Sequence, residues 1–300
     1  MEKQRNKKGP LPIGVRIIGI IIAVLAAAYG LYAGMGNSTG NFDGEMQIFA
    51  LDVGQGDSFF IISPNGKTML IDSGESSNSK QIEQFIREKG VRQLDVVIGS
   101  HTHSDHVGSM PYLLDAFDVG KYVMSEAGLE TRIQKRINAV LEEKDIPCSY
   151  VWAGDVIDWD SDCKVTVLSP VPEFDEYSKT DWNEWSLIIR AEYANHSMIF
   201  TGDATVRSEQ AAMLNNEKYL FDADVLKVPH HGSTTSSSLG FLEAVSPEYA
   251  IISVGKGNSY GHHDYDTIQK LKQVNAEIYR TDELGTINIV FSADDIKIIY

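Results

Sequence analysis

The segment HTHSDH at positions 101–106 places three histidines and a carboxylate within six residues. Neutral imidazoles and carboxylates are ligands for zinc, manganese or iron. Alternate residues of an extended segment point the same way, so His101 and His103 can hold one ion. Asp105 and His106 then turn toward another. The segment therefore predicts a metal site.

Two later segments supply further donors. Asp203 ends the apolar run MIFTGD after Gly202, which lets the backbone turn, and its two carboxylate oxygens can bridge two cations. His230 and His231 follow a second apolar run. Adjacent residues that leave a strand point in different directions. We therefore expect His231 to bind metal and His230 to donate a hydrogen bond to a developing oxyanion.

All three segments follow an apolar run that is typical of a buried strand, at 95–100, 198–202 and 224–229. Ligands collect at the carboxyl ends of strands in α/β proteins, so we expect one shared site. From Glu45 onward strands alternate with helices, which predicts sheets with helices outside them. The pattern predicts helices at about 79–89, from 111, and at 129–144, 205–217, 237–244 and 265–274, and a short strand at 155–159.

Seven motifs in chain order carry a family resemblance. Taken together, they resemble the metallo-β-lactamase fold superfamily. More narrowly, they are similar to the extracellular hydrolase domain of ComEC-type DNA-uptake proteins, and they are also similar to phosphorylcholine esterases. The motifs are LDVGQGD (51–57), LIDSG (70–74), HTHSDH (101–106), FTGD (200–203), VPHHGS (228–233), SVG and NSYGH (253–262), and RTDELGTI (280–287).

The resemblance implies an α/β fold, an αββα sandwich, with two divalent metal ions, Zn²⁺ or Mn²⁺, between the edges of its sheets. It implies that Asp57 and Asp72 orient the ligands, the role that the residues behind a metal site play. The ligands that it implies are His101 and His103 for the first ion, Asp105, His106 and His231 for the second, and Asp203 as the bridge.

The sequence departs from the superfamily at one ligand. Many members supply another histidine to the first ion from a strand end in the middle of the chain. Here that stretch is the Asn-x-x-Ser segment at 183–186. We therefore expect the first ion site to be weak or incomplete. His196 lies nearby, but it precedes the FTGD strand on a predicted hairpin tip, where we expect it to be exposed.

These features predict an enzyme, a metal-dependent hydrolase that acts on phosphoester bonds with a hydroxide held between two cations. We expect Asp105, His230 and His262 to be catalytic. His262 lies on a Gly-rich loop at 253–264, where Lys256, Asn258 and Tyr260 can also contact phosphate.

Three classes of function remain open. The first is a phosphodiesterase that resembles a nuclease and acts on nucleic acid or nucleotides. The second is a hydrolase of small or cell-wall phosphoesters, or of another ester. The third is a non-catalytic binding protein on the same fold.

Charge bears on this choice. The 300 residues include 42 acidic and 26 basic side chains, a net charge of −16, and residues 37–300 alone carry −20. Such a field repels nucleic acid and anionic membrane at long range. We therefore expect no stable nucleic-acid-binding module, and any polyanionic substrate has to be received by local cations such as bound metal. The sequence leaves the oligomeric state open.

Residues 1–36 are typical of a targeting segment. A basic stretch ends at Arg16, and residues 17–34 then run without a charge. This run is long for a signal peptide and just sufficient for a membrane span, while the small residues at 26–28 offer a cleavage site. A cleaved signal and an anchor both remain open. With the basic flank inside, either one places the rest of the chain outside the cytoplasmic membrane.

The expected organisation is a leader at 1–36, a linker at 37–45 and one hydrolase domain at 46–300. The only contact with membrane is then through the leader. The domain has two cysteines, Cys148 and Cys163, too few for a disulfide scaffold. A single disulfide and two unpaired thiols both remain open.

Overall fold

The computed structural model describes residues 44–172 and 180–300. The predicted leader lies outside the described residues, as does nearly all of the predicted linker. Within the two described ranges, no helix combines the length and the apolar character that a bilayer span requires. The fold below is that of the part beginning at Gly44.

The first sheet has eight strands in the order β16-β15-β1-β2-β3-β5-β7-β8. Antiparallel pairing joins β16 through to β3, and parallel pairing joins β3 through to β8. The strands are β1 (Met46–Ala50), β2 (Phe59–Ile62), β3 (Thr68–Ile71), β5 (Val96–Gly99), β7 (Tyr122–Met124), β8 (Cys148–Tyr150), β15 (Ile287–Phe291) and β16 (Ile296–Ile299).

The second sheet has six strands in the order β14-β13-β12-β11-β10-β9. Strands β9 to β11 pair antiparallel, and β11 to β14 pair parallel. Its members are β9 (Cys163–Ser169), β10 (Ile188–Tyr193), β11 (His196–Phe200), β12 (Val225–Lys227), β13 (Tyr249–Ile252) and β14 (Glu277–Arg280). The short strands β4 (Gln93–Leu94) and β6 (Asp118–Val119) pair with each other.

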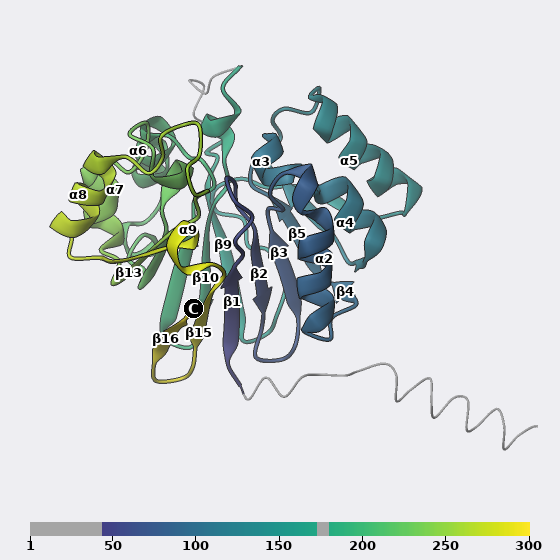
Figure 1. Ribbon diagram of the computed structural model, residues 1–300, viewed down its shortest axis with the longest axis horizontal. Coiled ribbons are helices and arrows are strands. Elements are labelled where there is room, and N and C mark those ends of the chain that lie inside the picture. The colour runs from purple at the N-terminus through teal and green to yellow at the C-terminus, as the bar shows by residue number, and fades with distance from the viewer. Residues whose placement is uncertain (1–43, 173–179) are drawn as a thin grey trace, which may run out of the picture. The chain divides into compact units, whose positions relative to one another are not determined.

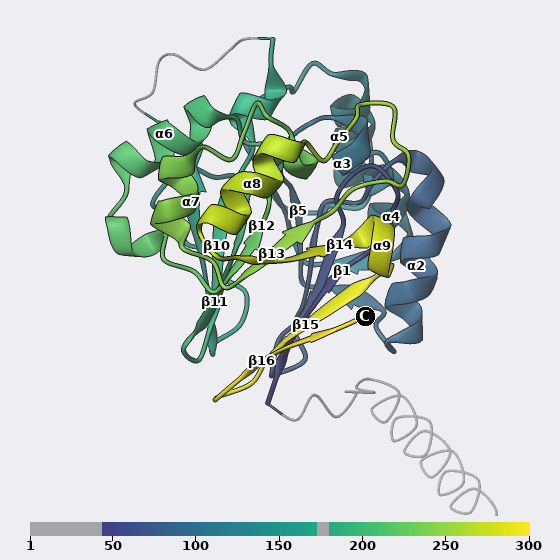
Figure 2. The ribbon, with the colours of Figure 1, turned by 60° about the vertical axis from the view of Figure 1, so that its left-hand side comes forward.

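Helices cover the outer face of each sheet (Figure 1). In Figure 2, α6, α7 and α8 lie on the side of the six-stranded sheet, and α2 and α4 lie on the side of the eight-stranded sheet. The helices are α2 (Ser79–Glu88), α3 (Ser104–Val107), α4 (Met110–Ala116), α5 (Arg132–Glu143), α6 (Val206–Asn215), α7 (Leu239–Val245), α8 (Tyr265–Gln273) and α9 (Thr281–Leu284). The 3₁₀ turns are η1 (Ser76–Asn78), η2 (Trp182–Trp185), η3 (Lys218–Leu220) and η4 (Pro229–Gly232).

Three apolar layers hold these elements together, one between the sheets and one under each set of helices. Strand β2 shows how one run serves two layers, because successive side chains point to opposite faces. Phe59 and Ile61 pack between the sheets, while Phe60 and Ile62 pack under the helices. Burial on both faces explains why the central strands are uniformly apolar. The predicted αββα sandwich is confirmed.

The strand predicted at 155–159 is wrong. Only an isolated bridge forms there, between Val156 and Thr166. The Asp155 carboxylate accepts a hydrogen bond from the Trp152 backbone N–H, which makes a turn, and the Trp159 indole N–H donates across to the Thr68 carbonyl oxygen. Pairing with β9 is brief: the Ile157 N–H donates to the Val165 carbonyl oxygen and the Val167 N–H to the Asp155 carbonyl oxygen, both at 2.9 Å.

Strands from both sheets deliver the predicted donors. His101 follows β5 of the eight-stranded sheet, whereas Asp203 follows β11 and His231 follows β12 of the six-stranded sheet. The backbone N–H of Leu187 donates to the Ser100 carbonyl oxygen at 3.0 Å, which joins the two sheets at this end. The donors therefore meet where the strand ends of two sheets come together, rather than along the edge of one sheet.

Candidate metal centre

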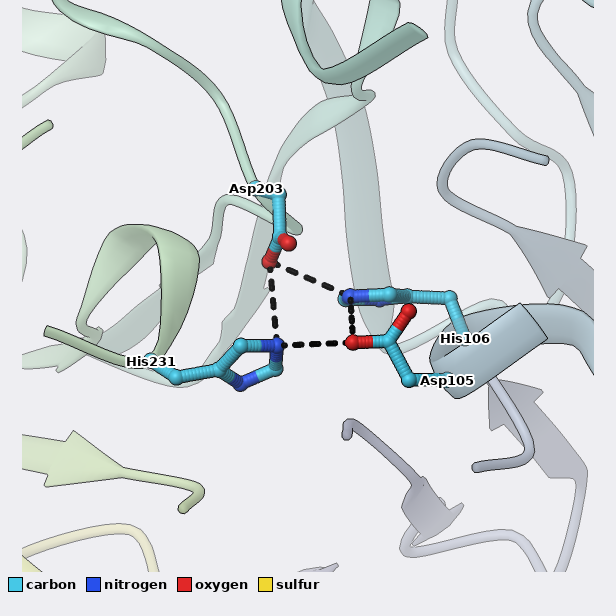
Figure 3. Close-up of side chains that lie close together, drawn as sticks. All are labelled: Asp105, His106, Asp203 and His231. Carbon is cyan, nitrogen blue, oxygen red and sulfur yellow. Dashed lines mark ion pairs between the residues drawn. The ribbon is translucent and has the colours of Figure 1, made fainter. Parts of the chain in front are cut away.

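Asp105, His106, Asp203 and His231 converge on one point (Figure 3). One ligand atom from each lies within 4.8 Å of the others. Asp203 Oδ1 is 3.1 Å from His106 Nε2 and 3.4 Å from His231 Nε2, and Asp105 Oδ2 is 3.5 Å from His231 Nε2. Three of the side chains are buried, and that of Asp105 is 24% exposed. We call these four residues the buried cluster.

A glycine places Asp105. A Cβ added at Gly56 would lie 2.2 Å from the Asp105 carbonyl oxygen, and the φ of +132° at Gly56 is also unfavourable for other residues. The Asp57 backbone N–H donates to the same carbonyl oxygen at 3.1 Å. The LDVGQGD loop therefore packs directly against the turn of α3 that carries Asp105 and His106.

His106 is oriented by a carboxylate behind it. Its Nδ1 lies 2.9 Å from Asp72 Oδ2, and Asp72 accepts further hydrogen bonds from the backbone N–H and the hydroxyl of Ser100. When Nδ1–H donates to Asp72, the lone pair of Nε2 faces the buried cluster. Asp72 thus occupies the orienting position that the motif comparison predicts for it.

His231 is turned inward by an unusual backbone. His230 and His231 both have left-handed φ values, 51° and 52°. This conformation buries the His231 ring and leaves the neighbouring His230 ring partly exposed. His231 Nδ1 donates to the Ser253 carbonyl oxygen at 2.8 Å, and since a carbonyl only accepts, Nε2 is left as an acceptor toward the cluster.

The potential ligand atoms of the buried cluster face one another. When both rings are neutral at Nε2, His106 Nε2, His231 Nε2 and Asp203 Oδ1 are buried acceptors that have no donor among the described residues. Leaving buried polar atoms unsatisfied is costly, and a cation between them satisfies all three at once. Two imidazole nitrogens and two carboxylates are a donor set that Zn²⁺ or Mn²⁺ accepts. The residues therefore fit a divalent ion.

Protonation of the metal-free cluster follows from the same geometry. Burial lowers the pKa of His231, but the carboxylates of Asp203 and Asp57 outweigh it and raise that pKa to about 9. Burial likewise opposes the charge on His106, while Asp203 and Asp105 raise the pKa of His106 well above its usual value. Protons therefore occupy the positions that a metal ion would take.

His101 and His103 form a separate pair. His101 Nε2 lies 3.1 Å from His103 Nδ1, and His101 Nδ1 lies 3.1 Å from Ser100 Oγ. Burial, and then the neighbouring His106, lower the pKa of His101 well below its usual value, so its ring is neutral. The described residues that group around a possible ion do not include this pair. The ring centroid of His101 is nevertheless 4.1 Å from that of His106.

Ser186 ends the segment where many superfamily members have a further histidine. Its buried hydroxyl accepts a hydrogen bond from the Asp203 backbone N–H at 3.1 Å. The segment therefore holds Asp203 in place by its backbone. It offers no imidazole to the His101–His103 pair.

His230 and His262 lie beside the buried cluster. His230 Nε2 is 3.5 Å from Asp203 Oδ2, the oxygen that does not face His106 and His231, and its Nδ1 is 2.8 Å from Thr235 Oγ1. Burial lowers the pKa of His230. The His262 ring centroid is 5.5 Å from that of His230. The structure thus brings both predicted catalytic histidines to one side of Asp203.

In the rest of the Gly-rich loop, Asn258 differs from the expectation, whereas the roles of Lys256 and Tyr260 stay predictions. The Asn258 amide bonds to the backbone of His262 and to the Gly255 carbonyl oxygen, so it holds the loop instead of facing a substrate. Lys256 is exposed, and the exposed Tyr260 stacks on His262 with the ring centroids 5.9 Å apart.

Two other expectations concern residues away from the cluster. His196 begins β11 at the end opposite Asp203, and its ring packs 5.6 Å from the Phe291 ring. It is therefore partly buried, and the prediction that it is exposed is wrong. Neither Cys148 nor Cys163 forms a disulfide, which decides that alternative in favour of unpaired thiols.

Sequence reasoning missed Lys227. This lysine is buried at the end of β12, and its Nζ lies 2.6 Å from Asp57 Oδ2. The signal was present in the sequence, because a lysine stands between Leu226 and Val228 in a strand that is otherwise apolar.

Comparison with known families decides the membership of the chain. Residues 51–256 match the metallo-beta-lactamase superfamily. This chain belongs to that superfamily. The match spans the buried cluster and the His101–His103 pair, so the metallo-beta-lactamase fold and the metal-ligand motifs are assigned to the same part of the chain.

Curated relatives of this metallo-beta-lactamase domain include three proteins of longer sequence. ComE operon protein 3 of Bacillus subtilis (strain 168) is 33% identical over 260 residues, which cover 81% of this chain and 33% of that protein. Recombination protein 2 of Haemophilus influenzae is 28% identical and Competence protein ComA of Neisseria gonorrhoeae is 28% identical, over 84% and 85% of this chain. The chain spans about a third of the length of these relatives, at 33%, 30% and 34%. The resemblance to ComEC-type competence proteins is confirmed.

Solved structures share the metallo-beta-lactamase fold. Igni18, a metallo hydrolase from Ignicoccus hospitalis, superposes with a TM-score of 0.53 at 13% identity, covering 85% of this chain and 99% of that one. CmlA, a diiron β-hydroxylase from Streptomyces venezuelae, gives 0.52 at 10% identity, covering 85% of this chain and 54% of that one. At these identities the likeness concerns the fold alone.

Proposed function

We propose that this chain is an exported, metal-dependent phosphodiesterase that acts on nucleic acid or nucleotides. The observation that carries the proposal is the set of buried acceptors, His106 Nε2, His231 Nε2 and Asp203 Oδ1, which face one another without hydrogen-bond partners among the described residues. Membership of the metallo-beta-lactamase superfamily supports a hydrolytic reaction.

Two divalent ions, Zn²⁺ or Mn²⁺, are the proposed cofactors. When bound, they supply an ionised water near neutral pH and stabilise the charge on phosphoryl oxygens. The proposed ligands are His101, His103, Asp105, His106, Asp203 and His231. Asp203 would be the shared ligand in this proposal, as the family resemblance implies; its Oδ1 faces the buried cluster, and its Oδ2 lies 3.5 Å from His230 Nε2.

His230 is proposed to donate a hydrogen bond to the phosphoryl group. Its lowered pKa keeps the ring neutral at pH 7, since burial disfavours the charged form. When Nδ1 accepts from the Thr235 hydroxyl at 2.8 Å, the proton resides on Nε2, which points to the side of Asp203. His262 lies next to it and is proposed to contact the leaving group, and Asp105 completes the catalytic set.

The substrate class is supported by two of the relatives, whose names refer to recombination and to competence. Export is supported by the basic and then uncharged sequence of residues 1–36. One observation favours a second candidate, a hydrolase of small or cell-wall phosphoesters. The charge of −20 on residues 37–300 repels a long polyanion more than it repels a small ester.

A metal-supplemented activity screen tests the proposal. The purified chain, stripped of metal and then given Mn²⁺ or Zn²⁺, is offered single-stranded DNA, plasmid, nucleotides, a phosphorylcholine ester and bis(p-nitrophenyl) phosphate. We expect cleavage of nucleic acid or nucleotides, and its loss with EDTA. Turnover of the small esters alone would replace the first candidate by the second. Failure to bind metal at all would contradict both.

A further inference from the structure

Lys227 carries a charge into the interior. Its side chain is only 1% exposed. Leu226, which precedes it in β12, and Val228, which follows the strand, are fully buried. Buried lysines are rare unless they are paired, because removing an ammonium from water is costly. Lys227 has two partners. Its Nζ is 2.6 Å from Asp57 Oδ2 and donates to the Gly202 carbonyl oxygen at 2.9 Å.

The two partners belong to different sheets. Asp57 lies in the loop between β1 and β2 of the eight-stranded sheet, while Gly202 follows β11 of the six-stranded sheet. One ammonium group therefore joins the two halves of the sandwich at the end where the buried cluster lies. Few other side chains could do this, since the contact requires a donor with several N–H bonds in a narrow space.

Each hydrogen-bonding or ion-pair partner of Lys227 is connected directly to a residue of the buried cluster. Gly202 directly precedes Asp203, and the peptide whose carbonyl Lys227 holds is the one that leads into that aspartate. The backbone N–H of Asp57 donates to the Asp105 carbonyl oxygen at 3.1 Å. The Lys227 ammonium is thus bonded to the peptide before Asp203 and to the residue whose backbone holds Asp105, and the His230 backbone N–H donates to the same Gly202 carbonyl oxygen at 3.1 Å.

Through Asp57, the charge of Lys227 also affects the orientation of the His106 and His231 rings. Asp57 Oδ1 is 3.4 Å from His231 Nδ1, and Asp57 Oδ2 is 3.7 Å from His106 Nδ1. Both nitrogens have better acceptors, at 2.8 Å and 2.9 Å. An Asp57 carboxylate without its ammonium would compete for these donors and rotate the rings, because a buried unpaired charge is strongly destabilised.

We propose that Lys227 is a positioning residue of the metal centre. It holds Gly202 and Asp57 together, and so keeps Asp203, His106 and His231 aimed at one point. This inference rests on the proposed function, in that the buried cluster holds a metal ion. It assigns a role to a buried side chain that bonds to both sheets beside the cluster.

The test measures Co²⁺ binding to the metal-free chain by its visible absorption. Two variants are compared, Asp57→Asn alone and Asp57→Asn with Lys227→Met. The first keeps the lysine bonded to Gly202 but leaves its ammonium without the Asp57 carboxylate, and the second removes both charges of the pair. We expect Co²⁺ affinity to be about 10- to 100-fold lower in the double variant than in D57N, with a changed absorption band, as is usual when the residues behind a metal ligand are lost.

The matched control is Lys67→Met. Lys67 pairs with Asp95 at 2.8 Å, but it is half exposed and lies at the end of β3 remote from Asp72. Its loss should leave Co²⁺ binding unchanged. Equal affinity and equal spectra for D57N and the double variant would overturn the role of Lys227. A wild-type chain that binds no Co²⁺ would instead contradict the proposed function.

A second variant serves if the double variant does not fold. Lys227→Arg keeps the charge but replaces the compact ammonium by a longer planar group. We expect it to fold, to bind Co²⁺ more weakly than wild type, and to show a shifted band. An unchanged band and affinity in K227R would count against the positioning role.

Discussion

The HTHSDH motif contains two pairs of potential metal ligands, and the two pairs lie in different surroundings in the fold. Asp105 and His106 join Asp203 and His231 in the buried cluster, with acceptors behind the two histidines. His101 and His103 face each other at 3.1 Å, with Ser186 where a further histidine is common in the superfamily. The comparison teaches that a ligand motif becomes a metal site only when other strands complete it.

The difference predicts unequal affinity at the two positions. The buried cluster draws on two sheets and has its imidazoles fixed from behind, so it should bind its ion tightly. In the proposal, the His101–His103 pair would offer two nitrogens and would take its third ligand from Asp203. We therefore expect one tight and one weak divalent ion. The following experiments are arranged by the size of their expected effects.

Asp203→Ala should have the largest effect, because Asp203 serves both groups in the proposal. We expect activity to fall by about a thousandfold or more, the order seen when a central member of a catalytic unit is lost. Metal analysis of the same preparation should show that neither ion is retained. Retention of full metal content would show that the aspartate does not bridge.

His106→Ala and His101→Ala separate the two groups directly. H106A should abolish the tight ion, since it removes a ligand from the buried cluster. H101A should reduce the stoichiometry from two ions to one and leave the tight ion bound. Calorimetric titration with Zn²⁺ measures both numbers. Equal losses in the two variants would contradict the distinction between the groups.

Asp72→Asn tests the support behind the cluster. Asp72 Oδ2 lies 2.9 Å from His106 Nδ1, and an amide at this position no longer offers a charged acceptor there. We expect a loss of metal affinity of about 10- to 100-fold with the fold retained. Competition with a chromogenic chelator provides the affinity. The tight ion should respond more than the weak one.

Metal affinity should rise with pH. Because the pKa of His231 in the metal-free chain is about 9, its ring is protonated at pH 7, and a metal ion binds only the neutral ring. Because the pKa of His106 is also raised well above its usual value, binding of an ion displaces protons from both rings, and affinity should fall at least tenfold for each pH unit below 9. Titrations in buffers of different ionisation enthalpy count the protons. An affinity that is independent of pH from 7 to 9 would refute this assignment.

Ser186→Ala should have the smallest effect. It removes the acceptor for the Asp203 backbone N–H and costs about 1 kcal/mol, or about fivefold in metal affinity. Thermal unfolding with and without Zn²⁺ separates loss of stability from loss of binding. A change larger than that of D72N would show that the serine does more than hold a backbone.

Much of the fold could be predicted from residue patterns. Helix α2 was expected at 79–89 and runs over Ser79–Glu88, because an apolar face recurs at helical spacing and Gly90 follows. The segment at 155–159 could not be predicted. Its apolar residues alternate as in a strand, but the turn depends on the carboxylate of Asp155 and the long-range bond of Trp159.

The candidate site likewise contains residues that the sequence predicts and contacts that it does not predict. Residue types and their positions after apolar runs predicted one shared site for all three segments, and the family resemblance implied that Asp105, His106 and His231 serve one ion with Asp203. They gave no sign that Ser186 holds the Asp203 backbone, or that Asn258 uses its amide within its own loop. Such contacts join residues of different loops, or depend on a loop conformation that composition does not specify.

By itself the sequence determined the chemistry available: imidazoles and carboxylates placed after apolar runs, in a strongly acidic chain. Only the tertiary structure decided which of these donors meet, and that Lys227 bonds to Asp57 and Gly202 behind them. The reason is physical. A strand's apolar pattern is set by its own residues, but a metal site between two sheets depends on distances between residues far apart in the chain, which are fixed only when the three apolar layers pack.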